Sequence, residues 1–254
     1  VKNIQSIQNL GTIDILCTDK TGTLTQDKIV LQKYIDAYGN EDLSILNYAY
    51  LNSYYGTGLK NIVDRAVISY GKEHNIDISN YEKIDEIPFD YTRKRMSVVV
   101  KKENHILITK GALEEVLKIC TKVKINKENE DINDDIIIKI KENAKLLANK
   151  GMQVIAIAEK REYPGINIFN EKDENNMTFI GLVGFLDPPK KDVKATISSL
   201  KKYGITTKVI TGDNQYATQN ICSLVGLEGD TLLGFEIDKM SDEELSKKVE
   251  DTTI

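Results

Sequence analysis

The residues best suited to chemistry begin at Asp19, in the run DKTGTLT at positions 19–25. A carboxylate such as that of Asp19 can attack the terminal phosphorus of ATP if neighbouring charge is neutralised and the reactants are held in line. Gly22 lets the backbone approach a phosphate closely, while threonine hydroxyls and backbone amides can donate hydrogen bonds to the phosphate oxygens. The run therefore predicts a phosphate-binding loop in which Asp19 is the nucleophile.

Two segments are expected to position the chemistry: one leads into this loop, and the other leads into a second loop near the other end of the chain. The apolar segment 12–18 leads directly into Asp19 and predicts a buried strand. Residues 192–203 have helical spacing and stop at Gly204, after which residues 205–210 predict another strand. The loop Thr211-Gly212-Asp213 follows that strand. Parallel, doubly wound sheets bring such loops together at the carboxyl ends of their strands.

Later residues continue the same alternation. Ala217, Ile221 and Val225 lie on one helical face, and Ser241 with Glu244 forms a capping box that predicts a last helix.

The long middle of the chain has a different pattern, which predicts a separate α+β unit inserted into the first one. Helical stretches are expected near 43–51 and 61–70. Strands are expected at 96–101, 105–109, 153–158 and 178–185. The polar stretches 126–135 and 171–176 are expected to be solvated loops without a function of their own.

Composition excludes several classes of protein. Apolar residues make up 41% and charged residues 29% of 254, as in an ordinary folded globular protein. The formal net charge of -5 argues against nucleic-acid binding, and no run approaches the roughly 20 apolar residues of a membrane-spanning helix. Three widely spaced cysteines and two histidines favour a reducing compartment without structural zinc.

Four motifs in this order resemble those of P-type cation-transporting ATPases. They are DKTGTLT at 19–25, KGA at 110–112, DPPK at 187–190 and TGD at 211–213. The resemblance implies that ATP phosphorylates Asp19, with Lys20 and Thr21 in the catalytic loop.

The same resemblance implies roles for the fourth motif. The Thr211 hydroxyl and Gly212 bind the transferred phosphoryl group, and Asp213 lies near the ribose and the magnesium site. Mg²⁺ is expected on Asp19 and Thr21.

The implied fold is α/β haloacid-dehalogenase-like, or Rossmann-like. A partial phosphorylation domain (residues 1–29 and 187–254) surrounds an inserted α+β nucleotide-binding domain (residues 30–186). The chain would cross between the domains near 28–31 and at the DPPK motif, where two consecutive prolines suit a hinge.

The family also implies how ATP is held in the inserted domain. Phe89 stacks on adenine, Lys94 and Lys110 neutralise phosphate, and Glu86 is a further candidate for the adenine amino group. Phe89 as an ordinary core residue is the alternative.

Gly111 and Asp187 complete the expected nucleotide-binding set. Relatives often carry an arginine near the nucleotide phosphates where this chain has Gln153, so ATP affinity is expected to be low unless another residue substitutes.

Within the superfamily the resemblance is closest to bacterial magnesium-importing pumps, carried by LCTDKTGTLTQDK at 16–28, NIVDRA at 61–66 and FLDPPK at 185–190. It implies transport of a cation, with Mg²⁺ favoured over calcium, through membrane helices and with an actuator domain of the same protein. The chain itself would lie at the cytoplasmic face of a bacterial membrane.

Two alternatives remain at this stage. One is a phosphatase with a large cap, although Thr21 stands where such enzymes usually carry an acid that activates water. The other is an isolated ATP-binding module of a calcium or other cation pump. Because no GDGxND loop occurs before Ile254, we expect a fragment that binds nucleotide without turning it over.

Overall fold

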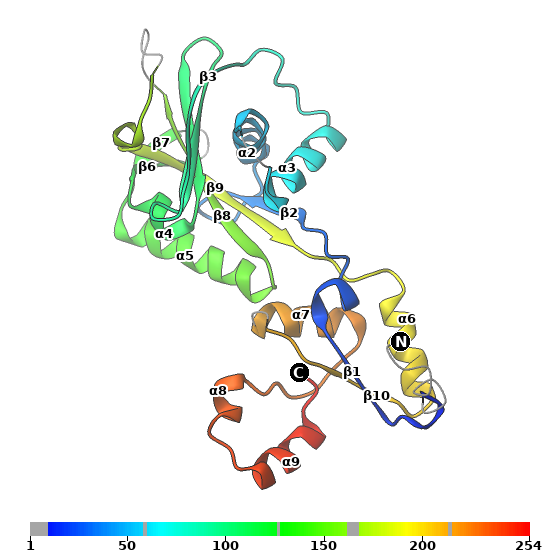
Figure 1. The fold of residues 1–254 in the computed structure, drawn as a ribbon. Helices are drawn as coiled ribbons and strands as arrows, with labels where there is room; N and C mark the ends of the chain where they lie inside the picture. Colours follow the sequence, from blue (N-terminus) through cyan, green and yellow to red (C-terminus); the bar gives the residue numbers. More distant parts are fainter. Residues whose placement is uncertain (1–9, 58–59, 126–127, 162–167, 213–214) are drawn as a thin grey trace. The chain divides into compact units, whose positions relative to one another are not determined.

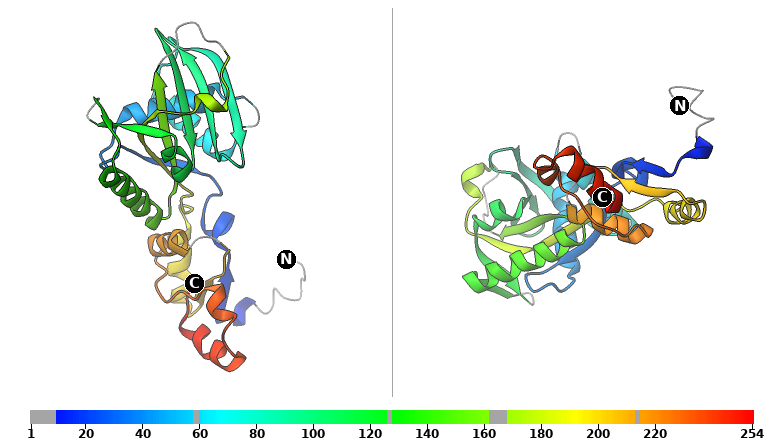
Figure 2. Two further views of the ribbon diagram at one scale, coloured as in Figure 1. Left: turned by 90° about the vertical axis from the view of Figure 1, so that its left-hand side faces the viewer. Right: turned by 90° about the horizontal axis from the view of Figure 1, so that it is seen from below.

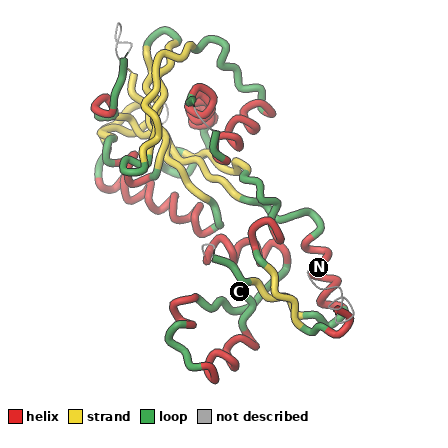
Figure 3. Tube along the Cα trace, in the orientation of Figure 1, coloured by secondary structure: helices red, strands yellow, loops and turns green. Residues whose placement is uncertain are grey.

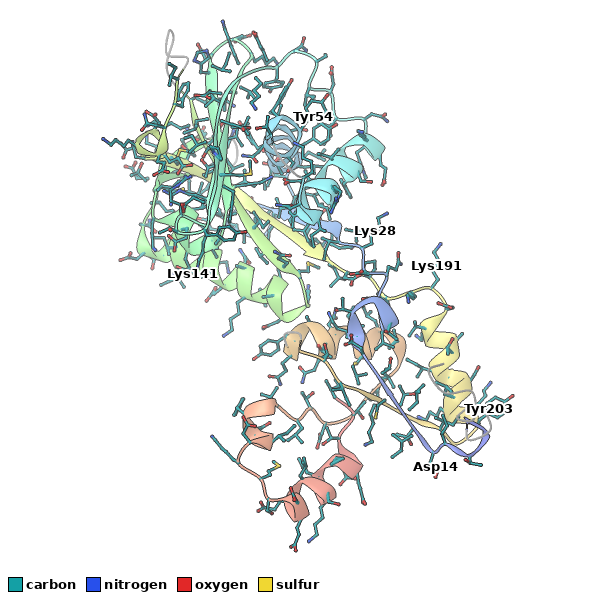
Figure 4. The ribbon with its side chains drawn as sticks, in the orientation of Figure 1. Asp14, Lys28, Tyr54, Lys141, Lys191 and Tyr203 are labelled. Atoms are coloured by element: carbon teal, nitrogen blue, oxygen red, sulfur yellow. The ribbon has the colours of Figure 1, made fainter. Side chains whose placement is uncertain are left out.

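The computed structural model describes residues 10–57, 60–125, 128–161, 168–212 and 215–254, which divide into two compact units. Unit 1 contains the described residues up to Lys28, Asn149–Gly151 and Asp187–Ile254. Unit 2 contains Ile29–Ala148 and Met152–Leu186. Lys28, labelled in Figure 4, is the last residue of unit 1 before the chain enters unit 2.

Unit 2 is built on an eight-stranded sheet in its described residues (Figure 1). Its strand order is β3-β4-β5-β8-β9-β6-β7, and β2 also pairs with β9. All neighbours are antiparallel except β6 and β9. The strands are β2 (Val30–Ile35), β3 (Glu82–Asp90), β4 (Arg95–Lys101), β5 (His105–Gly111), β6 (Cys120–Ile125), β7 (Glu128–Asp131), β8 (Gln153–Arg161) and β9 (Met177–Leu186).

The strand β9 has three partners and is buried along almost its whole length. β8 follows one edge of β9, whereas β6 pairs with the first residues of the other edge and β2 with the last. Both faces are covered as well, which explains why β9 is a continuous apolar run rather than an alternating one. β9 therefore forms the centre of unit 2.

Helices cover the two faces of this sheet. Val98 and Val100 pack with α2 (Leu43–Tyr55) and α3 (Ile62–Glu73). Val99, between them, packs on the opposite face with α5 (Asp134–Asn149), which lies against the sheet in Figure 2. The period of two along a strand thus separates two apolar cores, one on each face.

Most of the regular structure in the described part of unit 1 is helical, and loops join the helices, as Figure 3 shows by colour. Its two strands, β1 and β10, are parallel to each other. The capping box of Ser241 and Glu244 starts α9 as the sequence predicts. The elements are η1 (Leu10–Thr12), β1 (Ile15–Thr18), η2 (Lys20–Leu24), α6 (Val193–Lys202), β10 (Thr206–Val209), α7 (Gln215–Val225), α8 (Gly234–Ile237) and α9 (Asp242–Asp251).

Unit 2 also contains two short helices: α4 (Leu113–Leu117) lies between β5 and β6, and η3 (Glu171–Asp173) lies between β8 and β9. None of the helices formed by the described residues is both long and apolar enough to cross a membrane.

The sequence predicts a buried strand before Asp19; the strand forms, but the prediction that it is buried is wrong. β1 forms, but its side chains are exposed or half-buried, and Ile15 is 52% exposed. Within the described residues β1 pairs with one strand, β10. An apolar run predicts a strand, whereas its burial depends on how many neighbours the strand acquires.

The two stretches expected to be solvated loops are only partly so. Residues 128–131 form β7, an exposed strand paired with β6, and α5 begins at Asp134; residues 126 and 127 lie outside the described residues. In the second stretch Glu174 is buried, and its carboxylate accepts hydrogen bonds from Arg93 and Arg95 of the β3–β4 hairpin. A polar composition alone could not reveal those partners.

Gly181 of β9 tests the close packing of this sheet. A Cβ atom there would lie 2.4 Å from the Ile35 carbonyl oxygen and 2.5 Å from the Ile45 side chain. We expect Gly181→Ala to lower the free energy of unfolding by about 1–3 kcal/mol, because the backbone of β2 would have to move. Urea unfolding followed by circular dichroism measures the change.

Gly234→Ala is the control, since a Cβ atom at Gly234 meets nothing within 4 Å. Equal stability of the two variants would contradict the close approach of β2 and β9.

Candidate functional site

Asp19 lies at the carboxyl end of β1, beside the loop that follows β10. Thr18 pairs with Val209, and the carbonyl oxygen of Thr18 accepts a hydrogen bond of 2.9 Å from the amide of Ile210. The parallel register therefore brings Asp19 and Thr211 to the same edge of the two-stranded sheet. The predicted residue Asp213 lies outside the described residues.

The loop after Asp19 folds back on itself. The Asp19 carboxylate is exposed and its Oδ1 accepts a hydrogen bond of 2.7 Å from the Lys20 amide. Gly22 has φ +73°, a conformation that glycine adopts at little cost. The turn closes with a 3.1 Å bond from the Thr25 amide to the Lys20 carbonyl oxygen. The exposed carboxylate of Asp19 thus stands on a well-defined turn.

Thr25 and Asp187 fasten this turn. Thr25 is fully buried, and its hydroxyl donates to Asp187 Oδ2 at 2.6 Å while accepting a bond of 3.2 Å from the Gly22 amide. The other oxygen of Asp187 accepts a bond of 3.1 Å from the Lys28 amide. Asp187 therefore holds the loop of Asp19, and its predicted contact with nucleotide stays a prediction.

The rest of the DPPK motif pairs with the same loop. The Pro188 carbonyl oxygen accepts a bond from the Gln26 amide at 3.0 Å, and the Lys190 amide donates to Leu24 at 2.9 Å. The Lys190 ammonium reaches the Gly22 carbonyl oxygen at 2.6 Å. Two motifs more than 160 positions apart in the sequence thus form one structure within unit 1.

A second candidate site is a cavity of about 110 Å³ in unit 2. Its walls are the end of α2 and the start of α3, together with Glu86, Phe89 and Met96 from the β3–β4 hairpin. Two of the predicted nucleotide-binding residues, Glu86 and Phe89, therefore share one cavity.

Lys110 lies beside this cavity and is only 7% exposed. Its ammonium donates to the Ser53 hydroxyl at 3.0 Å and forms an ion pair with Asp64, which lines the cavity. Burial lowers the pKa of Lys110 below its ordinary value, and the Asp64 carboxylate opposes that shift. Lys110 is thus a partly neutralised cation behind the cavity wall.

Glu86 is held by a different set of partners. It accepts hydrogen bonds from the Thr57 amide at 2.7 Å, from the Thr57 hydroxyl, and from the Lys83 ammonium at 2.8 Å. Burial alone would raise the pKa of Glu86, but these hydrogen bonds lower it below the ordinary value. Glu86 therefore offers a carboxylate, not a carboxylic acid, at neutral pH.

Phe89 is not a core residue, because 52% of it is exposed. Its ring centroid lies 5.3 Å from that of Tyr91, which is 88% exposed. Exposed apolar rings at the rim of a polar cavity are available to stack on a planar ligand. The exposure of Phe89 contradicts the alternative in which it is an ordinary core residue.

Lys94 is not among the residues that line the cavity, although its backbone lies beside the end of β5. Its carbonyl oxygen accepts a 3.0 Å bond from Ala112. A Cβ atom at Gly111 would lie 2.6 Å from that oxygen and 2.5 Å from Arg95 Cβ, so only glycine fits at position 111. The predicted Gly111 thus permits the approach of the turn that carries Lys94.

Of the residues that line the cavity, the sequence predicted Glu86 and Phe89 as site residues and missed the rest. Among the missed ones, Asn52 and Ser53 lie in the last turn of α2, Asp64 lies in the first turn of α3, and Lys60 precedes α3. The Lys60 ammonium binds the carbonyl oxygens of Ser53 at 2.6 Å and Tyr54 at 3.1 Å. The pattern Asn61-x-x-Asp64 signals a helix start, but no local pattern indicates that Asp64 pairs with a lysine.

One oxygen at the cavity, Oδ1 of Asn52, is a buried hydrogen-bond acceptor. The amide nitrogen of Asn52 donates to the Ile108 carbonyl oxygen at 2.7 Å, whereas Oδ1 has no hydrogen-bond partner among the described residues. A buried unpaired acceptor is costly and is a feature of places that receive a ligand or water.

The donors expected for Mg²⁺ are hard oxygen atoms near Asp19. Mg²⁺ prefers such donors, keeps several waters, and often uses one or two carboxylates together with substrate phosphates. The exposed Asp19 and Thr21 fit that pattern. No group of three or more His, Cys, Asp or Glu side chains gathers within the described residues, so these residues would share the ion with phosphate and water.

Comparison with known proteins places these sites in context. Residues 8–192 match the family model described as P-type ATPase, cytoplasmic domain N. The whole chain is 43% identical to the magnesium-transporting ATPase, P-type 1, of Escherichia coli K12 and 41% identical to that of Salmonella typhimurium LT2. It is 32% identical, over 98% of its length, to calcium-transporting ATPase 1 of Bacillus cereus. The chain spans 29–31% of the length of these relatives.

The clamp between Thr25 and Asp187 can be tested by removing one hydroxyl. Thr25→Val is isosteric and leaves Asp187 Oδ2 and the Gly22 amide without their partner. We expect the free energy of unfolding of unit 1 to fall by about 1–3 kcal/mol, the cost of unsatisfied buried polar groups. Urea unfolding measures it.

Thr25→Ser keeps the hydroxyl and is expected to stay much closer to the wild type. A Thr25→Val variant as stable as Thr25→Ser would show that the hydrogen bonds of the Thr25 hydroxyl do not stabilise unit 1.

The buried pair of Lys110 and Asp64 gives a second test. Lys110→Met leaves Asp64 as an uncompensated buried charge and is expected to cost about 3–5 kcal/mol of unfolding free energy. The double variant Lys110→Met/Asp64→Leu removes both charges and is expected to be more stable than the single one. A double-mutant cycle by chemical denaturation checks this, and strictly additive losses would contradict the pairing.

Proposed function

This chain belongs to the P-type ATPase family, and from that premise we propose that unit 2 binds ATP and that Asp19 of unit 1 accepts its terminal phosphate. The observation that carries the proposal is the exposed Asp19 carboxylate at the carboxyl end of β1, on a turn fastened by Thr25 and Asp187. Open α/β sheets bind their ligands at such strand ends.

Unit 1 would then be the phosphorylation domain, with a haloacid-dehalogenase-like fold. The parallel pairing of β1 with β10 and the loops that follow both strands support this assignment. Unit 2 would be the inserted nucleotide-binding domain, between crossings at residues 28–29 and 186–187.

The nucleotide would enter unit 2 with its base in the cavity. Phe89 offers its exposed face to the adenine ring, and the Glu86 carboxylate or the Asn52 carbonyl oxygen accepts from the exocyclic amino group. A cavity of about 110 Å³ is smaller than the ~300–1,000 Å³ of sites that enclose a whole ligand, so the phosphates would extend beyond it. Lys94 and Lys110 would supply positive charge.

The reaction transfers one phosphoryl group. An Asp19 oxygen forms a bond to the terminal phosphorus while the bond from that phosphorus to its bridging oxygen breaks, and ADP leaves with the electron pair. Lys20, Thr21, Thr211 and Gly212 would orient the phosphoryl oxygens. Mg²⁺, when bound by Asp19 and Thr21, would neutralise phosphate charge.

For the protein that contains this chain, we propose ATP-driven cation transport at a bacterial membrane, with magnesium as the cation. Support comes from relatives at 41–43% identity named magnesium-transporting, against 32% for one named calcium-transporting. Membrane helices and an actuator domain of the same protein would be the partners, and this chain would lie on the cytoplasmic side.

ATP binding is tested with Phe89→Ala in the 254-residue chain. Loss of base stacking, which contributes about 1–3 kcal/mol, is expected to weaken ATP binding about tenfold. Isothermal titration measures the dissociation constant. Tyr38→Ala is the matched control, because Tyr38 is similarly exposed (47%) and does not line the cavity. Equal affinities of the two variants would contradict the proposed pocket.

Phosphorylation is tested in the full-length protein with radiolabelled ATP and acid quenching. We expect a hydroxylamine-sensitive phosphoprotein that Asp19→Asn abolishes, because an amide cannot form an acyl phosphate. Label that persists in Asp19→Asn would locate the phosphate elsewhere.

A further inference from the structure

Glu174 is a buried carboxylate that belongs to neither candidate site. Its side chain is 0% exposed. One oxygen accepts hydrogen bonds of 2.7 Å from Arg93 Nη1 and from Arg95 Nε, and the other accepts a bond of 2.6 Å from the Ser97 hydroxyl. All three donors come from the β3–β4 hairpin, so one carboxylate holds three points of that hairpin.

The electrostatics favour a rigid arrangement. A lone buried carboxylate is strongly destabilising, whereas charge-assisted bonds from two guanidinium groups compensate for its lost hydration. The planar guanidinium fork also fixes the direction of each bond. Removing the charge of Glu174 would take an anion from both arginines and leave Arg93 its ion pair of 3.4 Å with Glu171.

The two arginines stand on either side of Lys94: Arg93 lies in the turn of residues 91–94 that joins β3 to β4, and Arg95 begins β4. Arg93 also donates through Nη2 to the Pro88 carbonyl oxygen at 2.8 Å, which ties the turn to β3. Lys94 has φ +48°, an unfavourable backbone conformation for a residue with a side chain. Such a conformation persists where the surroundings enforce it, and the bonds to Glu174 are such surroundings.

Glu174 is also linked to β5. The Ser97 hydroxyl that donates to Glu174 is 2.7 Å from the Thr109 hydroxyl, and both residues are fully buried. Thr109 immediately precedes Lys110. The hydrogen bonds that start at Glu174 therefore reach both the β3–β4 hairpin, which carries Phe89, and β5, which carries the buried Lys110.

We propose that Glu174 is a positioning residue for nucleotide binding, which presents Phe89 and Lys94 to the ligand by anchoring Arg93 and Arg95. This role rests on the proposed binding of ATP by unit 2. Glu174 does not itself line the cavity, so it acts through the hairpin.

Unit 2 provides a matched control in Glu159. It is also a buried carboxylate with two cations, Arg161 at 3.0 Å and Lys124 at 3.5 Å. Lys124 lies in β6 and Arg161 in β8, so neither of these cations belongs to the β3–β4 hairpin. Glu174→Gln and Glu159→Gln therefore remove the same charge from similar surroundings, but only the first loosens the hairpin that carries Phe89.

The experiment compares both variants with the wild-type 254-residue chain. Glu174→Gln is expected to bind ATP about tenfold more weakly and to shift the amide resonances of Phe89 and Lys94 in the free chain. Glu159→Gln is expected to bind within about twofold of the wild type and to leave those resonances unchanged, even if urea unfolding shows a similar loss of stability. Titration calorimetry and amide spectra supply the two readouts.

Each other outcome overturns a defined statement. Wild-type affinity in Glu174→Gln, or an equal loss in Glu159→Gln, overturns the positioning role alone. A wild-type chain that does not bind ATP overturns the proposed function and the positioning role with it. If Glu174→Gln does not fold, Arg95→Lys keeps the charge but loses the Nε donor; it is expected to weaken ATP binding at least threefold, and unchanged affinity overturns the role.

Discussion

Lys110 has almost no access to water, so its ammonium must find neutralising partners inside unit 2. Asp64 from α3 and Ser53 from α2 provide them, and these two helices form much of the wall of the cavity. Burying a charge without such partners would cost several kcal/mol. The pair therefore fixes the helices relative to β5, and the shape of the cavity depends on it.

The same constraint recurs at the other buried polar groups. Glu174 is satisfied by the β3–β4 hairpin, and Thr25 by Asp187, in each case from a segment distant in sequence. Because an unpaired buried group is costly, each of these contacts selects one arrangement of its loop over the alternatives. The segments selected in this way are the loop of Asp19 and the β3–β4 hairpin that carries Phe89 and Lys94.

Exposed and buried residues have different tasks in this arrangement. Asp19 and Phe89 present reactive or stacking surface to the solvent, where a substrate can reach them. Thr25, Lys110 and Glu174 are buried beneath these loops and hold them. Binding and catalysis profit from such support, because a side chain held in place loses less freedom when it meets its ligand.

The sequence by itself determined part of the regular elements and the loop residues, but it gave no prediction of β2, β3, β6 or α5. Period and capping predicted α6, β10 and α9, and Gly22 indicated a turn, because these signals depend on neighbours within a few positions. It did not reveal that β1 is exposed, that Asp64 pairs with Lys110, or that Glu174 is buried. Those partners lie 46 and about 80 positions apart, and only the pairing of strands and the packing of helices bring them together. A charged residue looks solvated in sequence until the tertiary structure removes the water and supplies the opposite charge.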